Sequence, residues 1–473
     1  MARPLRATDL PPWRPTLQGR TGPKARGILE ALVEGIRSGQ LRPGDRLPPQ
    51  RDIAAQLGVD LTTVTRALRE AGGLGLIEAS AGRGSFVAAG ARASLAPDPA
   101  DAGALVDLSM NIPPQPAAAR LAERIPADLA AMLATPAGMA HLHYQETAGA
   151  EQDRLAAARW LGRRHDDVPP ECVLVAAGAQ SVLHALARLL LAPGDILCAG
   201  TFTYPGLKAV ASQLGIVLWP LPMDAEGILP DAFAACCRAQ RPKALYLVPA
   251  ADNPTTATMG AERRQAVARV AADHGVPIIE DDAYAELAGD GLPSLASLAP
   301  DLVWHVDTLS KCATPALRTA FVLAPSRAGA RRLTAMLRAT SLMAPPLMTA
   351  LASRWIGDGT LAAIVEAIRA ENAIRQRLAV QALSGARFAA VPTCHHLWLE
   401  LDSGWSAEAF AGHAARAGLA VMPGSAFAVG HVELEAVRVS LGAPSSRPAL
   451  AEALHRLGQL LDEPPSGMHR PVI

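Results

Sequence analysis

Apolar residues recur at helical spacing near the start of the chain. In residues 24–39 they share one helical face, which predicts an amphipathic helix. Two shorter helical patterns follow at residues 50–58 and 60–73. Gly58 ends the first pattern, and Asp60 stands at the cap position of the second. Two short helices joined by a tight glycine-containing turn predict a helix-turn-helix motif.

The second helix of this motif is expected to turn a polar face away from its buried side. Hydroxyl and guanidinium groups on such a face are suited to base edges and DNA phosphates. These candidate DNA contacts are Thr62, Thr63, Thr65, Arg66 and Arg69. Residues 76–88 then predict two short strands around a glycine-rich tip, a wing that sets Arg83 against the DNA. A small helical bundle with a solvated basic face is the alternative interpretation.

The formal charges cancel over the whole chain, with 44 basic and 44 acidic residues among 473. Residues 1–90 hold 13 basic and 8 acidic side chains, so the remainder carries the opposite excess. Residues 89–106 are rich in Ala, Pro, Gly and Asp and lack periodicity, which is typical of a linker. We therefore expect a DNA-binding domain at residues 21–88 and a larger domain at residues 107–462. A disordered acidic chain and a collagen-like repeat do not fit this composition.

The N-terminal segment, the apolar runs and the cysteine spacing indicate the cellular compartment of the protein. The N-terminal segment lacks the apolar core of a secretory signal, and no stretch reaches the roughly 18 apolar residues of a membrane span. The six cysteines show neither CxxC nor zinc-like spacing, so the sequence predicts no disulfide framework and no metal site. We expect a soluble, cytoplasmic protein without a membrane partner.

In the larger domain, apolar runs alternate with helical patterns, as in a mainly parallel sheet flanked by helices. Ligands of open α/β sheets bind at the carboxyl edge of the strands, where several polar residues stand here. These candidates are Gly178, Ala179, Gln180, Asn253, Asp281, Tyr284, Ser310, Lys311 and Arg318. Only four residues of the chain are lysine, and burial beside strands favours the neutral amine of Lys311 that a Schiff base needs.

The candidates near the strand ends match the ring of pyridoxal 5'-phosphate. Lys311 would form the Schiff base. Asp281 would keep the pyridine nitrogen protonated, so that the ring can accept electrons. Asn253 and Tyr284 would hydrogen-bond the 3-oxygen of the ring, and Tyr204 would stack on its face.

A second group of candidates matches the phosphate of the same cofactor. Arg318 and Ser310 would bind phosphate oxygens, together with backbone N–H groups of the turn at residues 178–180, where a helix begins. Each residue also has an ordinary structural interpretation, such as a turn at Asn253 or a helix cap at Asp281. Their joint occurrence in this order favours the cofactor.

Residues 24–88 resemble the winged-helix domain of GntR-type bacterial regulators. The motifs are G-x-L-x-P-G-x-x-L-P from Gly39 to Pro48, the run Arg51 to Ala54, T-V-x-R-A from Thr63 to Ala67 and G-R-G-S-F-V from Gly82 to Val87. The resemblance implies that Arg51 holds a DNA phosphate and that the helix from Thr62 to Arg69 reads the major groove. Leu61 stands where the family often has arginine, so no operator sequence is implied.

Residues 107–460 resemble the fold-type I aminotransferase domain of class I and II. The motifs are Tyr144 with Gly149, Gly178-Ala179-Gln180, Tyr204-Pro205-Gly206, Asn253-Pro254, Asp281 to Tyr284, Ser310 to Arg318, Met422 to Phe427 and Val437 to Ser440. The resemblance implies an α/β fold with a small C-terminal α/β subdomain. It also implies that Arg438 grips a substrate or effector carboxylate, and that Tyr144 reaches the cofactor phosphate of the partner subunit in a homodimer.

A GntR-like winged helix, a linker and an aminotransferase-like domain in one chain resemble the MocR subfamily of bacterial transcription regulators. That resemblance implies a regulator that binds double-stranded operator DNA and senses an amine, an amino acid or vitamin B6. The alternative is an active aminotransferase with an appended DNA-binding domain, because the same residues would support at least a transamination half-reaction. An enzyme whose N-terminal module binds protein fits less well with a basic wing.

Overall fold

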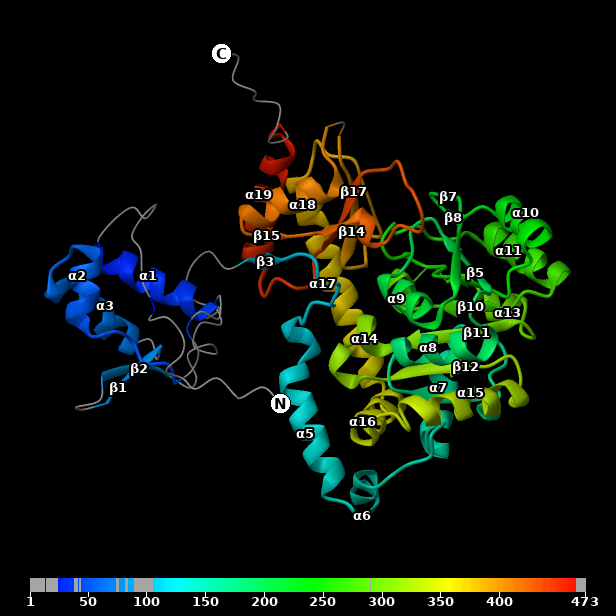
Figure 1. Cartoon of the computed structure of the whole chain (residues 1–473). Coiled ribbons are helices and arrows are strands. Elements are labelled where there is room, and N and C mark those ends of the chain that lie inside the picture. Colours follow the sequence, from blue (N-terminus) through cyan, green and yellow to red (C-terminus); the bar gives the residue numbers. More distant parts are fainter. Residues whose placement is uncertain are drawn as a thin grey trace, which may run out of the picture. The chain divides into compact units, whose positions relative to one another are not determined.

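The computed structural model describes residues 13, 24–37, 41, 44–73, 76–80, 84–88, 105–289, 291–402 and 404–464. The chain divides into two compact units, residues 1–104 and 105–473 (Figure 1). Leu105 and Val106 were assigned to the linker by composition, yet they belong to the second unit, in which the first strand begins at Val106.

The first unit is a three-helix domain with a two-stranded hairpin. Its elements are α1 (Lys24–Arg37), α2 (Gln50–Leu57), α3 (Leu61–Gly73), β1 (Ile77–Ser80) and β2 (Gly84–Val87). Gly58 adopts a left-handed backbone (φ 59°) at the end of α2, which lets the chain turn directly into α3. The carbonyl of Asp60 accepts the first helical N–H groups of α3, from Thr63 and Val64.

The apolar positions of the three helices form one core, as their spacing predicts. Ile28, Ile53 and Val64, one from each helix, are completely buried in it. Leu57, the last residue of α2, is half-buried and packs against this core. The strands β1 and β2 pair antiparallel, so the predicted helix-turn-helix and hairpin are confirmed among the described residues.

The second unit is built on a seven-stranded sheet with the order β4-β12-β11-β10-β9-β5-β6. Its strands are β4 (Val173–Ala176), β5 (Ile196–Gly200), β6 (Val217–Leu221), β9 (Ala244–Leu247), β10 (Ile278–Asp281), β11 (Val303–Thr308) and β12 (Ala320–Leu323). Neighbouring strands are parallel except at β12, which runs antiparallel to β4 and β11. The mainly parallel sheet is thus confirmed.

Helices cover this sheet, and its central strands are buried over their whole length. Consecutive residues of strand β10 point to opposite faces of the sheet and enter different apolar clusters: Ile278 packs in one and Ile279 in the other. The helices of the unit are α5 (Leu121–Leu133), α6 (Pro136–Met139), α7 (Glu151–Leu161), α8 (Ala179–Leu190), α9 (Pro205–Leu214), α10 (Pro230–Gln240), α11 (Ala261–His274), α12 (Ala285–Ala288), α13 (Leu295–Leu298), α14 (Leu309–Cys312), α15 (Arg327–Thr340), α16 (Pro346–Gly357), α17 (Thr360–Ala382), α18 (Ala407–Arg416) and α19 (Arg447–Leu461).

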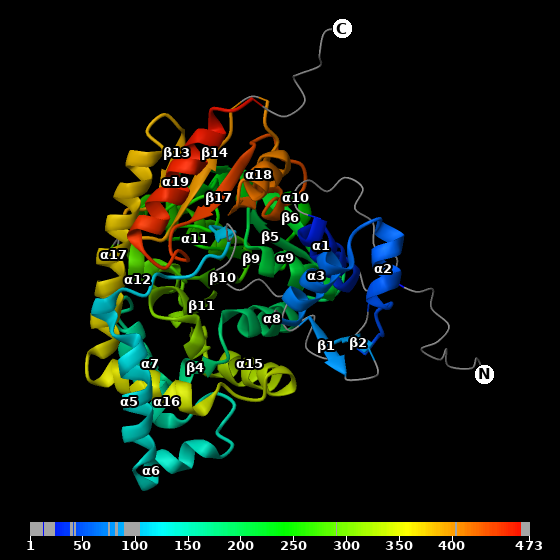
Figure 2. The ribbon, with the colours of Figure 1, turned by 90° about the vertical axis from the view of Figure 1, so that its left-hand side faces the viewer.

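A smaller antiparallel sheet forms the C-terminal subdomain, with the order β13-β14-β17-β16 (Figure 2). Its strands are β13 (Phe388–Ala390), β14 (His396–Glu400), β16 (Met422–Pro423) and β17 (Ala436–Ser440). The long helix α17 joins both parts of the unit, because Leu361 packs in the core of the large sheet and Ala379 in that of the subdomain. Short two-stranded pairs complete the unit: β3 (Val106–Asp107) with β15 (Leu419–Ala420), and β7 (Met223–Asp224) with β8 (Gly227–Ile228).

None of the helices in the described part of the chain is long and apolar enough to cross a membrane.

Candidate functional site

Polar side chains from three neighbouring strands meet at the carboxyl edge of the large sheet. Strand β10 ends at Asp281, and β11 leads into α14, which carries Lys311. The segment after β9 carries Asn253, whose Oδ1 accepts a 2.7 Å hydrogen bond from Arg438 of β17. The sheet edge and the subdomain therefore meet at this site.

Lys311 lies in a buried, polar environment. Its Nζ donates a 2.5 Å hydrogen bond to the backbone oxygen of Asn111. Burial lowers the pKa of Lys311 to about 8, with a further contribution from the positive charge of Arg438 and an opposing one from Asp281. Its neutral amine is therefore accessible near physiological pH, and its role as the Schiff-base residue remains a prediction.

Asp281 has one anchored oxygen and one free oxygen. Its Oδ2 accepts a 2.8 Å hydrogen bond from the hydroxyl of Tyr246, whereas Oδ1 is buried and has no hydrogen-bond partner among the described residues. Burial raises the pKa of Asp281 to about 6, and the bond from Tyr246 opposes that rise. A buried oxygen without a donor costs free energy unless a ligand supplies one, and a protonated pyridine nitrogen is such a donor.

Two further residues surround Lys311 and Asn253. The hydroxyl of Tyr284 accepts a 2.9 Å hydrogen bond from Nδ2 of Asn111, so Asn111 binds both Tyr284 and Lys311. The guanidinium of Arg438 lies 4.9 Å from the ring centre of Phe427 and also donates to the backbone oxygen of Ser109. Its Nε is buried without a hydrogen-bond partner in the residues that the structure describes, which leaves a donor for a ligand carboxylate.

A small cradle lies at the N-terminus of α8, where free N–H groups favour an anion. Gly178 has φ 82°, and a Cβ there would lie 2.8 Å from Nη2 of Arg318, so only glycine lets this guanidinium come so close. Oε1 of Gln180 is buried and lacks a hydrogen-bond partner within the described ranges. A Cβ on Gly206 would lie 2.4 Å from that oxygen and 2.3 Å from the ring of Tyr204, so both side chains crowd this glycine.

Among the other cofactor candidates, Ser310 is half-buried, as Lys311 is, and Arg318 is exposed. The hydroxyl of Ser310 accepts a 3.2 Å hydrogen bond from Thr308, directly before Lys311. Tyr144 is 82% exposed on the surface of the single chain, after α6. Its expected role across a subunit interface remains a prediction.

The residues expected to contact DNA differ in their exposure to solvent. Thr62, Arg66 and Arg69 are exposed on α3, and Arg51 is exposed on α2. Thr63 is half-buried, and so is Thr65. The hydroxyl of Thr65 binds Oε1 of Gln50 at 2.8 Å and the carbonyl of Leu61 at 2.9 Å. Thr65 therefore joins α2 to α3, contrary to its expected position on the exposed face. Arg83 lies outside the described residues.

Three residues of the site carry no sequence motif that marks them. Tyr246 is one of only four tyrosines in the chain and lies on the strand next to Asp281. Asn111 and Ser109 follow β3, about 200 residues before Lys311, and no local pattern marks them. Ser109 acts through its backbone oxygen, which any residue type would supply.

These features fit pyridoxal 5'-phosphate. The free oxygen of Asp281 would accept the ring N–H, the neutral amine of Lys311 would supply the nucleophile for the aldehyde, and the cradle at Gly178 would hold the phosphate. Fold and site together define a pyridoxal-phosphate-dependent protein of fold type I.

Comparisons with known proteins agree with this class. Residues 104–457 match the family described as aminotransferase class I and II. LysN, an α-aminoadipate aminotransferase from Thermus thermophilus solved with N-(5'-phosphopyridoxyl)-L-leucine, has 26% identity and a TM-score of 0.69. The similarity covers 76% of this chain and 92% of LysN.

The first unit matches a second family. Residues 24–87 match the bacterial regulatory proteins of the gntR family. YdeF, an HTH-type transcriptional regulator of Bacillus subtilis, is 30% identical over 95% of this chain and 97% of its own length. The probable rhizopine catabolism regulatory protein MocR of Rhizobium meliloti is 27% identical over 76% of each chain. The protein belongs to the GntR-type regulators of the MocR kind, which carry an aminotransferase class I and II domain.

Proposed function

We propose that this protein is a cytoplasmic transcription regulator whose second unit senses an amine, an amino acid or a B6 compound. Its winged helix would bind operator DNA. The observation that carries the sensing role is the buried guanidinium of Arg438, which bonds Asn253 in the same site as Lys311 and keeps a free Nε. An effector carboxylate would accept a hydrogen bond from Nε of Arg438, and the amine of the same effector would lie near Lys311.

The residues around Lys311 prepare the ring end of the site. When bound, pyridoxal 5'-phosphate supplies an electrophilic carbon and an electron-accepting ring. Lys311 provides the neutral amine, and Asp281 holds the proton on the ring nitrogen while Tyr246 fixes its second oxygen. Tyr284, whose hydroxyl accepts a hydrogen bond from Asn111, would hydrogen-bond the 3-oxygen of the ring.

Gating requires that the effector bind two arrangements of the protein with different affinity, because only that difference shifts their populations. The DNA-binding end supplies exposed guanidinium groups at Arg51, Arg66 and Arg69, which suit phosphate contacts.

We further propose a homodimer formed by the second unit. Met139 and Leu142, within five residues of Tyr144 in the chain, are also exposed, at 48% and 54%. Large apolar side chains clustered on a surface favour a protein partner. Sedimentation of the full chain tests this directly: a monomer that still holds one cofactor per chain would contradict the role of Tyr144 across the interface.

The decisive experiment combines DNA binding with turnover. The full-length, cofactor-loaded protein is titrated onto DNA from upstream of its own gene, with and without a panel of amino acids and amines. We expect specific binding that one effector class shifts, and no substantial multiple-turnover transamination with pairs of amino and keto acids. Rapid turnover without specific DNA binding would overturn the proposal.

An active aminotransferase with an appended DNA-binding domain is the second candidate. The lowered pKa of Lys311 and the free oxygen of Asp281 favour it, because proton transfer needs both groups. The turnover arm of the same experiment separates the two functions.

A further inference from the structure

A second charged site lies on the opposite face of β10 from the cofactor. Because side chains of a strand alternate, Asp281 faces the cofactor site while Glu280 and Asp282 face away from it. Next to Asp282 is a cavity of about 10 Å³, enough for one water molecule or one ion. Its charged and polar lining consists of Arg164, His165, Asp282, Glu286, His305 and Asp307.

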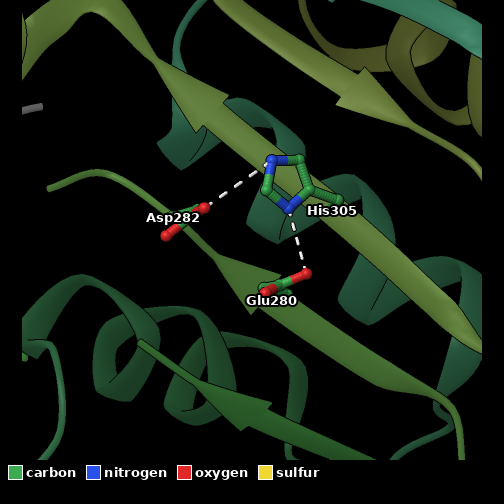
Figure 3. A group of neighbouring side chains, drawn as sticks. All are labelled: Glu280, Asp282 and His305. Carbon is green, nitrogen blue, oxygen red and sulfur yellow. Dashed lines mark hydrogen bonds and ion pairs between the residues drawn. The ribbon is translucent and has the colours of Figure 1, made fainter. Parts of the chain in front are cut away.

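His305 stands between two carboxylates in this site (Figure 3). Its Nδ1 lies 3.0 Å from Oε2 of Glu280, and its Nε2 lies 3.9 Å from Oδ2 of Asp282. The last distance is too long for a hydrogen bond. Ligand atoms of these three residues lie within 4.8 Å of one another, and all three side chains are buried.

Two buried atoms beside His305 lack partners. Asp282 and His165 line this cavity, and Oδ1 of Asp282 and Nε2 of His165 have no hydrogen-bond partner in the part of the chain that the structure describes. Asp282 is 2% exposed and His165 is 6% exposed, so bulk water does not satisfy them. The rings of His165 and His305 lie 4.5 Å apart, edge to face. Two imidazoles and one carboxylate therefore surround the same small space.

We propose that this cavity binds a divalent transition-metal ion, with Zn²⁺ as the best match to two imidazole nitrogens and a carboxylate oxygen. The ligands would be Nε2 of His305 and Oδ1 of Asp282, and Nε2 of His165 would complete the set by a shift toward them, because the group whose ligand atoms already lie within 4.8 Å of one another is Glu280, Asp282 and His305. Nε2 of His305 lies 3.9 Å from Oδ2 of Asp282, which shows that the ring and this carboxylate reach the same space, and the other oxygen, Oδ1, has no partner among the described residues.

The outer contacts of the two histidines support this assignment. Metal-binding imidazoles characteristically use their second nitrogen to bond a carboxylate or another polar group, which fixes the ring. Here Nδ1 of His305 bonds Glu280, whose carboxylate is itself held by the backbone N–H groups of Leu295 and Ala296. Nδ1 of His165 bonds the hydroxyl of Ser294 at 3.0 Å. Both Nε2 atoms are thereby left for an ion.

The charge balance favours a divalent cation. Four carboxylates belong to the site: Glu280, Asp282, Glu286 and Asp307. Two guanidinium groups oppose them, Arg164 at 2.9 Å from Asp282 and Arg163 at 3.1 Å from Glu286. With both histidines neutral and all four carboxylates ionised, two negative charges would remain, and buried charge without compensation is costly. Burial raises the pKa of Asp282 and of Glu286, and a bound cation would favour the ionised form of both. Arg164 contacts Oδ2 of Asp282, so Oδ1 stays available to the metal.

An ion also has a route to this site. A solvent-open pocket of about 450 Å³ adjoins the small cavity and shares four lining residues with it: Arg164, His165, Ala285 and Glu286. A bound ion would link β10, β11 and the segment after α7 on the face of the sheet opposite to Asp281. Sequence spacing did not reveal the site, because His165 and His305 are 140 residues apart and the fold brings them together.

The test is metal binding by tag-free, full-length protein. The protein is stripped with a chelator, equilibrated with Zn²⁺ or Co²⁺ and measured by elemental analysis, with the visible spectrum of the Co²⁺ form as a second readout. We expect one ion per chain. His305→Gln and Asp282→Asn should each weaken binding at least 100-fold, and Ser294→Ala about 10- to 100-fold as a loss of an outer contact. His274→Gln, at an exposed histidine of α11, is the matched control and should bind as the wild type does.

Two outcomes would overturn the proposal. In the first, wild-type protein takes up neither ion stoichiometrically, and a water molecule fills the cavity instead. In the second, His305→Gln keeps wild-type affinity, which would place any bound ion elsewhere. The wild-type measurement stands without the variants, so a variant that fails to fold does not remove the test.

Discussion

The hydroxyl of Tyr246 donates a 2.8 Å hydrogen bond to Oδ2 of Asp281, and both side chains are buried. The two residues lie on the neighbouring parallel strands β9 and β10, where Tyr246 pairs with Ile279. This register places the tyrosine two residues before Asp281 on the same face of the sheet. The bond anchors one oxygen of Asp281 in the protein and leaves the other for the cofactor.

Tyr246→Phe is expected to weaken cofactor binding. It removes the donor that stabilises the buried charge of Asp281, and hydrogen bonds to charged groups contribute about 1.5–3 kcal/mol, or about 10- to 150-fold in affinity. Fluorescence titration of the apo protein with pyridoxal 5'-phosphate measures the change. Tyr204→Phe, which keeps a ring for stacking, is the control and should stay within about threefold of wild type. Equal losses in both variants would contradict the special role of Tyr246.

The pKa of Lys311, about 8, predicts how cofactor attachment depends on pH. Burial disfavours the ammonium form, so the lysine becomes neutral at a lower pH than an exposed one. The rate of covalent attachment should rise with pH, reach half its maximum near pH 8 and level off above about pH 9. Stopped-flow absorbance of apo protein mixed with the cofactor measures this profile. A rate that keeps rising beyond pH 10 would show an ordinary lysine.

Lys311→Ala checks the identity of that amine. After borohydride reduction and peptide mass mapping, wild-type protein should carry the cofactor on Lys311, and the variant should carry none. DNA binding should remain in the variant, because the winged helix has its own core around Ile53 and Val64.

Much of this site could be predicted from sequence because its residues follow strand ends. Lys311 and Asp281 each come at or just after an apolar run, and the period of the pattern fixes which edge of the sheet they reach. Tyr246 and Asn111 could not be predicted in the same way. Their roles depend on which strands become neighbours and on contacts across about 35 and 200 residues of chain, which no local pattern encodes.

The helix-turn-helix shows a similar division. Spacing correctly placed Val64 inside and Arg66 outside, since a helix has one period. The same spacing predicts that Thr65 lies on the exposed face of α3. In the structure its hydroxyl instead bonds Gln50 of the preceding helix. A threonine at the edge of the buried face can direct its hydroxyl toward solvent or toward the neighbouring helix. Here Gln50 on α2 provides the hydrogen-bond acceptor that favours the second orientation.

Gly178→Ala is expected to disrupt the phosphate cradle. The residue has φ 82°, and the added methyl group would lie 2.8 Å from Nη2 of Arg318, so either the turn or the guanidinium must move. Backbone strain of this kind costs about 1–3 kcal/mol. We expect cofactor affinity to fall about 10-fold or more in an equilibrium titration. Gly385→Ala, where a Cβ meets nothing within 4 Å, is the matched control and should leave affinity unchanged.

Arg438→Gln should separate carboxylate recognition from amine recognition. The variant loses the guanidinium that bonds Asn253, and with it the charge for an effector carboxylate. Spectral titrations of the cofactor-loaded protein with L-amino acids should show affinities about 10- to 100-fold weaker. The corresponding decarboxylated amines should bind within about threefold of their wild-type affinity. A parallel loss for both classes would mean that Arg438 supports the site rather than reading the carboxylate.

Arg51 and Thr62 are expected to affect DNA binding in different ways, because one suits phosphates and the other suits base edges. Arg51 is exposed on α2, and Thr62 is exposed at the start of α3. Removal of one phosphate contact lowers the slope of log K against log salt by about 1 and weakens binding to all sequences alike. Arg51→Ala should therefore lose affinity uniformly and give the shallower slope. Thr62→Ala should keep the slope and change the ranking of operator variants. Binding measured at several salt concentrations, on a library of operator variants, distinguishes the two results. An unchanged salt slope in Arg51→Ala would exclude a phosphate contact at that position.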